Sequence, residues 1–344
     1  MKLTSVYSVK EELSSGPDLP RSVTSAIGVR RASKRLSERV HRAHVRRPES
    51  AQVALGVCKG KRKGDFYLSA RVQVSRAAAK LADDIRKKTR GECDIRIVPS
   101  IEKRQPPISF FRGRRRPLEA GLSTGVVIPG TRHAGTLGFM VEDDRAYYVL
   151  SNNHVLADVN ESQPGDPVTQ PGTLDRRASQ QTLIGVLDRY VPISFIRSNL
   201  VDAAVAEIFP DISFWLGWTE AIPGVVKGIR EISVDDLGRP VSKAGRTTGV
   251  TSGTISSVDI DRLRVNMGTP QQPKIAQFSD QIEIVGDDGK LFSTSGDSGS
   301  LIVDTTGRAV ALLFAGGQDQ NGIDLTFANR IETVLSQLGV RLAL

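Results

Sequence analysis

The residues best suited to chemistry lie in one stretch, residues 293–300, which reads Ser-Thr-Ser-Gly-Asp-Ser-Gly-Ser. Two glycines, Gly296 and Gly299, flank Ser298 and allow a sharp backbone turn where a side chain would clash. In such a turn the backbone N–H groups of Gly296 and Ser298 can point into one small space. That space would hold the negative oxygen that develops when a serine hydroxyl attacks a carbonyl group. Because a serine hydroxyl is a weak nucleophile at neutral pH, it needs a base and a group that orients the base.

The chain contains only four histidines, which narrows the search for the base. Two of them lie in an arginine-rich N-terminal segment that is too polar to pack, and His133 follows a Pro-Gly pair in a turn-like segment. His154 follows the apolar run 147–150 and precedes a second apolar stretch. We therefore expect His154 at a strand end that leads into a short helix, which is a rigid mount for a base.

Asp202 is the best candidate for the orienting group, because it lies within the apolar sequence Leu-Val-Asp-Ala-Ala-Val-Ala. A carboxylate among apolar residues is costly unless it accepts hydrogen bonds, and an imidazole N–H would supply one. Asp188 is a second candidate, but the adjacent Arg189 gives it a simpler explanation as a surface residue. The sequence thus predicts His154 as base, Asp202 as orienting group and Ser298 as nucleophile.

This order of residues resembles the chymotrypsin-like (trypsin-like) serine peptidases, in particular a bacterial group without disulfides. The matching segments are residues 151–155 (Ser-Asn-Asn-His-Val), 201–205, 243–255 and 296–300. The resemblance covers residues 121–344 and implies a mainly β fold, with a double antiparallel β-barrel and a C-terminal helix. It also implies that one barrel supplies His154 and Asp202, that the other supplies Ser298, and that the N–H groups of Gly296 and Ser298 form an oxyanion hole.

The resemblance further implies where a peptide substrate would bind. Its backbone would pair with the strand that contains Phe314, Ala315 and Gly316. The floor of the side-chain pocket would come from residues such as Phe292 and Thr294, and the far wall from residues 323–326. Asp324 is either a negative charge in that pocket, which would favour Arg or Lys, or a loop residue. The acidic position of trypsin-type enzymes, six residues before the serine, is Phe292 in this chain.

Asp297 matches the aspartate that receives a newly made amino terminus when some members of the family are activated by cleavage. The sequence offers no obvious activation terminus of this kind. Asp297 is therefore either part of an activation mechanism or a turn residue.

The composition limits the class of protein. The chain has 344 residues, 39% of them hydrophobic, which leaves room for two or three domains. No apolar run approaches the ~20 residues that span a bilayer, and we expect no signal peptide at the N-terminus. Only two cysteines occur, Cys58 and Cys93, and we expect buried thiols or a conditional disulfide in a reducing, cytoplasmic compartment. Neither the cysteines nor the histidines have metal-ligand spacing, so we expect no metal or other cofactor.

Charge is divided unevenly along the chain. Residues 1–118 carry a net charge of +18 and residues 119–344 a net charge of −9. The basic part either binds nucleic acid or another anionic partner, or lies against the acidic body of its own chain, or is solvated surface with a disordered tail.

The N-terminal third divides into three parts. We expect residues 1–50 to form a basic, largely disordered tail. Residues 51–102 predict a small α/β module with a hairpin over 53–74, a helix over 75–88 capped by Ser75, and a strand over 93–98. Such a module would act as an inhibitor, a folding aid or a docking site. Residues 103–120 form a basic linker, and we predict cleavage after Arg112, Arg114 or Arg115.

The sequence as a whole predicts a serine endopeptidase in residues 121–344. We expect the N-terminal region to restrain it and cleavage in the basic linker to activate it. The alternatives are a catalytically silent protease scaffold, and a basic protein that binds nucleic acid or another anionic partner.

Overall fold

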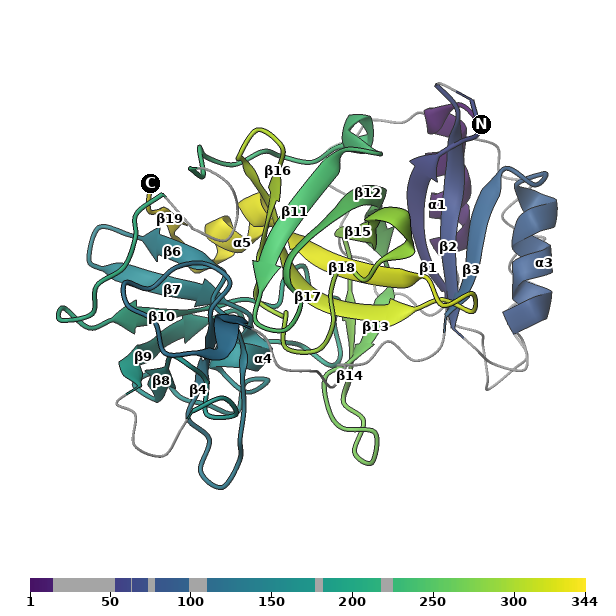
Figure 1. Cartoon of the computed structure of the whole chain (residues 1–344). Coiled ribbons are helices and arrows are strands. Elements are labelled where there is room, and N and C mark those ends of the chain that lie inside the picture. Colours follow the sequence, from purple (N-terminus) through teal and green to yellow (C-terminus); the bar gives the residue numbers. More distant parts are fainter. Residues whose placement is uncertain (15–52, 63, 74–77, 99–109, 177–181, 218–224) are drawn as a thin grey trace.

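The computed structural model describes residues 1–14, 53–62, 64–73, 78–98, 110–176, 182–217 and 225–344. These residues form a mainly β structure in which a closed six-stranded barrel lies between a curled half-barrel and the N-terminal module (Figure 1). The predicted fold class, a chymotrypsin-like arrangement with two β units and a C-terminal helix, is confirmed. Among the helices in these ranges, none is long and apolar enough to cross a membrane.

Most strands of the closed barrel are buried over nearly their whole length, and only the longest of them alternates between buried and partly exposed residues. Ile255, Ile282 and Ile284 are among its fully buried interior side chains. Pairing of the first two strands, with Lys243 opposite Thr251, closes the barrel. In spatial order the strands are β11 (Pro240–Gly245), β12 (Gly249–Asp261), β15 (Gln281–Gly286), β18 (Asp324–Arg330), β17 (Ala309–Gln318) and β16 (Leu301–Asp304).

Two short segments near the barrel are not part of it. Residues 225–227 form only isolated contacts, and β13 (Leu263–Asn266) pairs with β14 (Ile275–Phe278) in a separate hairpin beside the barrel. Three short 3₁₀ helices complete the irregular segments: η1 (Phe110–Arg112), η2 (Val234–Asp236) and η3 (Asp287–Gly289).

The half-barrel is an open sheet of eight strands. Two neighbouring strands inside this sheet pair antiparallel with Ser151 opposite Ala204. In spatial order the strands are β19 (Arg341–Leu342), β6 (Phe139–Glu142), β7 (Tyr147–Ser151), β10 (Ala204–Ile208), β9 (Leu183–Tyr190), β8 (Pro167–Thr169), β4 (Ser123–Val126) and β5 (Gly135–Thr136). The sequence did not predict β4, β8 or β19, which are too short to show a periodic pattern.

The predicted C-terminal helix is confirmed as α5 (Ile331–Leu338), with Ile331, Val334, Leu335 and Leu338 buried. Gly339 ends the helix with φ 65°, a left-handed conformation that glycine adopts without a Cβ clash. The chain then returns to the half-barrel as β19, so the C-terminal segment joins both β units.

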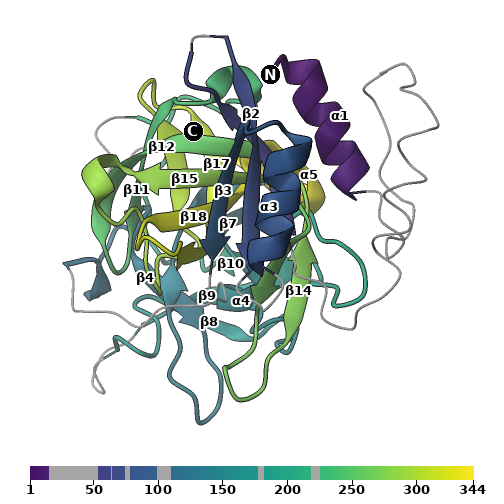
Figure 2. The same ribbon diagram turned by 90° about the vertical axis from the view of Figure 1, so that its right-hand side faces the viewer.

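The N-terminal module contains the predicted hairpin, helix and strand: β1 (Val53–Lys59), β2 (Phe66–Gln73), α3 (Ala78–Lys88) and β3 (Cys93–Val98). The predicted helix cap, Ser75, lies outside the described residues. β1 pairs antiparallel with the long strand β12, so the module continues the sheet of the closed barrel. Helix α3 packs on this extension, as Figure 2 shows from the side.

Part of the predicted N-terminal tail is structured. Residues Leu3–Ser14 form helix α1, which buries Val6 against the module, and the Tyr7 hydroxyl donates to Asp259. Val6 is the helix's only fully buried apolar side chain in the described part, so the sequence carries little amphipathic signal. Tertiary contacts rather than local propensity therefore stabilise it. Residues 15–52 lie outside the described ranges.

The basic linker predicted over residues 103–120 is described only from residue 110. This described part is packed rather than free. Phe111 is buried, and the Arg115 backbone N–H donates to Oε1 of Gln170 at 3.0 Å. Gly113 and Arg114 in this part are nevertheless exposed, so cleavage after Arg112, Arg114 or Arg115 stays a prediction.

The two cysteines do not lie on neighbouring strands, so the conditional disulfide is wrong. Cys58 on β1 pairs with Tyr67, and Cys93 on β3 pairs with Leu68, on opposite sides of β2. Because side chains alternate along a strand, the two thiols also point to opposite faces of the sheet. Burial raises the pKa of Cys58 to about 12, as expected for an unreactive thiol.

Candidate active site

His154 and Asp202 meet at the same end of two neighbouring strands. His154 lies on the short helix α4 (Asn153–Leu156), which follows β7, and Asp202 precedes β10. The His154 Nδ1 atom makes a short contact with Oδ2 of Asp202, and the His154 backbone N–H donates to Oδ1 at 3.1 Å. Both side chains are buried. Asp202 thus fixes the orientation of the His154 ring through its Nδ1 atom.

Residues of the closed barrel hold Asp202 in place. Its backbone N–H donates to Oδ1 of Asn329 at 2.9 Å, and Asn329 Nδ2 donates to Oε1 of Gln281 at 2.6 Å. From the half-barrel, Asn152 Nδ2 donates to the Asp202 carbonyl at 2.7 Å. Sequence reasoning missed Asn329 and Gln281, because nothing in the sequence marks them as neighbours of Asp202.

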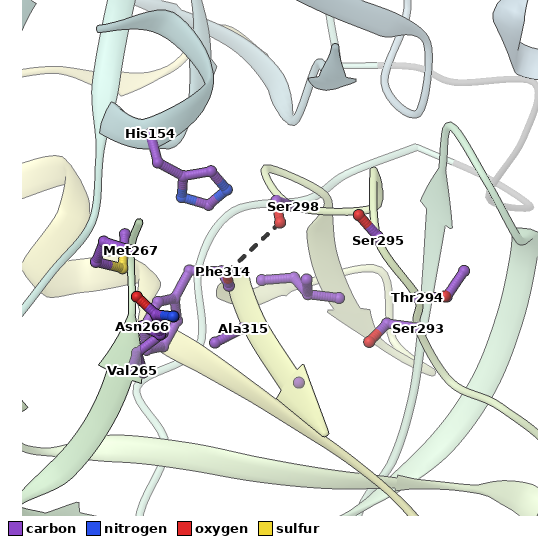
Figure 3. Close-up of a pocket in the computed structure, with 12 residues that line it drawn as sticks. His154, Val265, Asn266, Met267, Ser293, Thr294, Ser295, Ser298, Phe314 and Ala315 are labelled. Carbon is purple, nitrogen blue, oxygen red and sulfur yellow. Dashed lines mark hydrogen bonds between the residues drawn. The ribbon is translucent and has the colours of Figure 1, made fainter. Parts of the chain in front are cut away.

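Ser298 lies across the cleft from His154, at the end of a loop from the closed barrel (Figure 3). Its hydroxyl donates to the carbonyl of Phe314 at 3.5 Å, a weak bond. Gly296 has φ 91°, and its carbonyl accepts a hydrogen bond from the Thr136 hydroxyl at 2.7 Å. No hydrogen bond between described residues occupies the backbone N–H of Gly296 or Ser298. The loop therefore has two donors available where the sequence predicted an oxyanion hole.

The side chain of Asp297 anchors this loop. Its buried carboxylate accepts hydrogen bonds from the backbone N–H groups of Thr247, Thr248 and Thr294 at 2.8, 3.1 and 2.9 Å. The Nζ atom of Lys243, also fully buried, lies 3.6 Å from Oδ2. Burial lowers the pKa of Lys243, and the nearby Asp297 carboxylate opposes this effect. An internal lysine thus lies beside the carboxylate that the resemblance matched to the acceptor of an activation terminus.

For the peptidase activity expected from the sequence, we predict that Asp297→Asn lowers kcat by about 100-fold, because misplacing an oxyanion donor costs on this scale. The amide cannot keep three acceptor contacts and also face an ammonium group. The matched control is Asp287→Asn, at an exposed turn where the carboxylate accepts only a 3.3 Å bond from Thr254. Equal kcat values for the two variants would contradict this role.

A second buried ion pair supports the loop behind Gly296. Arg246 binds Asp175 through both carboxylate oxygens, at 2.5 and 2.7 Å. A Cβ atom at Gly296 would lie only 2.4 Å from Nη1 of Arg246, so only glycine fits there. The neighbouring Thr247 hydroxyl donates to the Ser295 carbonyl at 2.8 Å. Arg246 lies in the segment 243–255 that carried the resemblance, but its partner Asp175 was not predicted.

The cleft beside Ser298 encloses about 440 Å³, part of it open to solvent, and its lining residues include no Asp, Glu, Lys or Arg. Phe314, Ala315 and Gly316 line it as predicted, and so does Thr294. Sequence reasoning missed the wall contributed by the β13 segment, which consists of Val265, Asn266 and Met267.

Asp324 and Phe292 do not line the described cleft. Asp324 is 3% exposed, and its Oδ2 atom accepts from the backbone N–H groups of Phe292 and Ser293 at 3.2 and 3.3 Å. Phe292 is fully buried beside Lys243. Asp324 therefore binds the backbone of Phe292 and Ser293. It does not make the contact with a substrate side chain that was one of its two predicted roles.

Comparison with known proteins gives two kinds of similarity in sequence. Residues 225–343 match the family model described as the Nal1 C-terminal domain, a range that includes Ser298 but neither His154 nor Asp202. Over 238 residues the chain is 26% identical to Protein NARROW LEAF 1 of Oryza sativa subsp. japonica. That alignment covers 60% of this chain and 38% of the relative, so the chain spans less than half of its length.

The solved structures that are similar include bacterial proteases. Thermobifida fusca Protease A has 19% identity and a TM-score of 0.45, over 65% of this chain and 97% of its own. Nocardiopsis protease has 17% identity and a TM-score of 0.45, over 66% of this chain and 98% of its own. A glutamic acid specific serine protease has 18% identity and a TM-score of 0.45, over 65% and 100%.

Proposed function

We propose that the protein is a serine endopeptidase in which His154, Asp202 and Ser298 form the catalytic triad. The observation that carries the proposal is the buried contact between His154 Nδ1 and Asp202, with His154 and Ser298 lining the same cleft. A buried carboxylate against one imidazole nitrogen, with a serine before the other, is the arrangement that activates a serine.

In the proposed mechanism the Ser298 hydroxyl turns from the Phe314 carbonyl toward His154. It attacks the peptide carbonyl while His154 Nε2 takes its proton, and Asp202 stabilises the resulting imidazolium. The N–H groups of Gly296 and Ser298 hold the oxyanion. His154 then protonates the leaving amine, and water hydrolyses the acyl-enzyme by the same steps.

The uncharged cleft supports a substrate with a neutral side chain before the scissile bond. Ser293 lines the cleft, and its hydroxyl shares a 2.6 Å hydrogen bond with the buried hydroxyl of Thr326. A charged substrate side chain would lose water there without gaining an opposite charge. This preference replaces the Arg or Lys preference that Asp324 in the pocket would have given.

We predict that kcat/KM for peptides with a neutral residue at this position exceeds that for Arg or Lys by about 100-fold. Ser293→Asp should add the missing negative charge and raise the relative value for Arg at least about tenfold. The measurement uses paired fluorogenic peptides that differ only at this residue, with Thr326→Val as a control that removes the same hydroxyl pair without adding charge. A wild-type preference for Arg would overturn the assignment.

The described residues give no support to restraint by the N-terminal region. None of the residues that line the cleft precedes His154. The module instead continues the barrel sheet through β1 and β12. We therefore propose that the described module is a structural part of the peptidase.

Digestion of a mixed peptide library, with product ends identified by mass spectrometry, tests the proposed function. Internal cleavage by the wild-type chain and none by Ser298→Ala is the expected result. Equal products from both proteins, or none from either, would contradict it.

A further inference from the structure

A shallow crevice, with about 220 Å³ of space that is partly open to solvent, lies where the N-terminal module meets strand β13. Three of its lining residues are arginines, and none is acidic. Its polar lining consists of Arg71, Gln73, Arg262 and Arg264, and apolar residues of β1, β3 and β13 complete it. The crevice is therefore basic and separate from the cleft that contains Ser298.

The charge of Arg71 is already balanced. Its Nε and Nη2 atoms donate to the two carboxylate oxygens of Glu283, both at 2.6 Å, and Nη1 lies 2.9 Å from Oδ2 of Asp94. Arg71 thus forms a fixed part of the crevice wall but contributes little unbalanced positive charge to it.

Arg264 differs from Arg71 in this respect. It is only partly exposed, and its guanidinium makes no hydrogen bond or ion pair with the described residues. Its backbone carbonyl accepts a long, 3.4 Å hydrogen bond from Nε2 of Gln73, which places that amide beside it. Burial lowers the pKa of Arg264. A half-buried guanidinium that has no carboxylate partner among the described residues is stabilised when an anion binds it.

Strand β13 connects the crevice to the substrate cleft. Leu263 and Arg264 line the crevice, and the next two residues, Val265 and Asn266, line the cleft. One buried apolar cluster contains Ala54 and Val98 of the module together with Val265, Met267 and Phe314. An anion bound to Arg264 would therefore hold the strand that forms one wall of the cleft.

We propose that this crevice binds a phosphate-type oxyanion, free or as a phosphoryl group, through Arg264 and Gln73. Guanidinium groups present paired N–H donors that match the oxygens of such an anion. We also propose that the bound anion steadies β13 and lowers KM for peptides. This second part rests on the proposed peptidase activity, whereas binding does not.

Binding is tested by the thermal unfolding midpoint of the full chain, with inorganic phosphate replacing chloride at constant ionic strength. We expect a rise of about 3 °C at a phosphate concentration near ten times its Kd. Arg264→Gln should abolish the rise, and Arg264→Lys should reduce it. The matched control, Arg62→Gln, removes an exposed arginine from the turn at the other end of β1 and should keep it. Phenyl phosphate in a second series shows whether a monoester also binds.

A rise that persists in Arg264→Gln, or no rise in the wild type, would overturn the site. If the rise depends on Arg264, the KM of the wild type should fall several-fold with phosphate while that of Arg264→Gln stays constant. An unchanged wild-type KM would overturn only the coupling. If the wild type hydrolyses no peptide under any of these conditions, the proposed function is contradicted, whereas the phosphate-binding result still holds.

Discussion

Ser298→Ala is expected to lower kcat for peptide hydrolysis by about 10⁴-fold or more, with little change in the unfolding midpoint. The hydroxyl makes only one weak contact, a 3.5 Å bond to the Phe314 carbonyl, so its loss costs little stability. The turn that presents it depends on other residues, since Thr136 and Asp297 hold the loop on either side. The substitution should therefore lower kcat without lowering the stability of the protein.

Asp202→Asn provides the comparison for this first prediction. An asparagine can keep the geometry but supports the wrong tautomer of His154, which costs about 10⁴-fold in kcat. Steady-state rates on a peptide with a neutral residue before the scissile bond measure both variants. Residual activity of Ser298→Ala near the wild-type value would place the nucleophile elsewhere.

Arg71→Met is expected to lower the free energy of unfolding by about 3–5 kcal/mol. The Arg71 and Glu283 side chains are 1% and 0% exposed, so the variant leaves a carboxylate buried without its main partner. This pair joins the N-terminal module to strand β15 of the closed barrel. The loss should appear as a lower midpoint of urea unfolding, measured on the full chain.

The double variant Arg71→Met with Glu283→Leu is the control for this second prediction. Replacing both charges with apolar side chains of similar size should recover most of the lost stability. Recovery would show that the cost came from the unpaired charge. A single variant as stable as the wild type would contradict the conclusion that this ion pair fastens the module to the closed barrel.

The sequence predicted the three candidate catalytic residues better than the residues that hold them in place. His154, Asp202 and Ser298 could be identified because each lies in a short local pattern of apolar residues or glycines. Asn329, by contrast, lies 127 positions from the Asp202 backbone that it binds. Lys243 likewise shows no local sign of its contact with Asp297. Such partners depend on how strands are ordered in space, which local spacing does not encode.

The same reason explains the errors about the N-terminal region. Its hairpin and helix follow local periodicity, and the structure contains them. The attachment of β1 to β12 joins residues about 200 positions apart, and no local pattern predicts it. The sequence did not predict the contacts of Asp324 for a similar reason, because its hydrogen bond with the Phe292 backbone forms only where β18 lies beside that residue.

Labelling with a fluorophosphonate probe tests the central claim most directly, because only an activated serine reacts. The account predicts one label per chain on the full-length protein, located by peptide mapping at Ser298, with none on Ser298→Ala. Asp202→Asn should react much more slowly than the wild type. A wild-type protein that is folded but does not react, or a label on any other residue, would contradict the account.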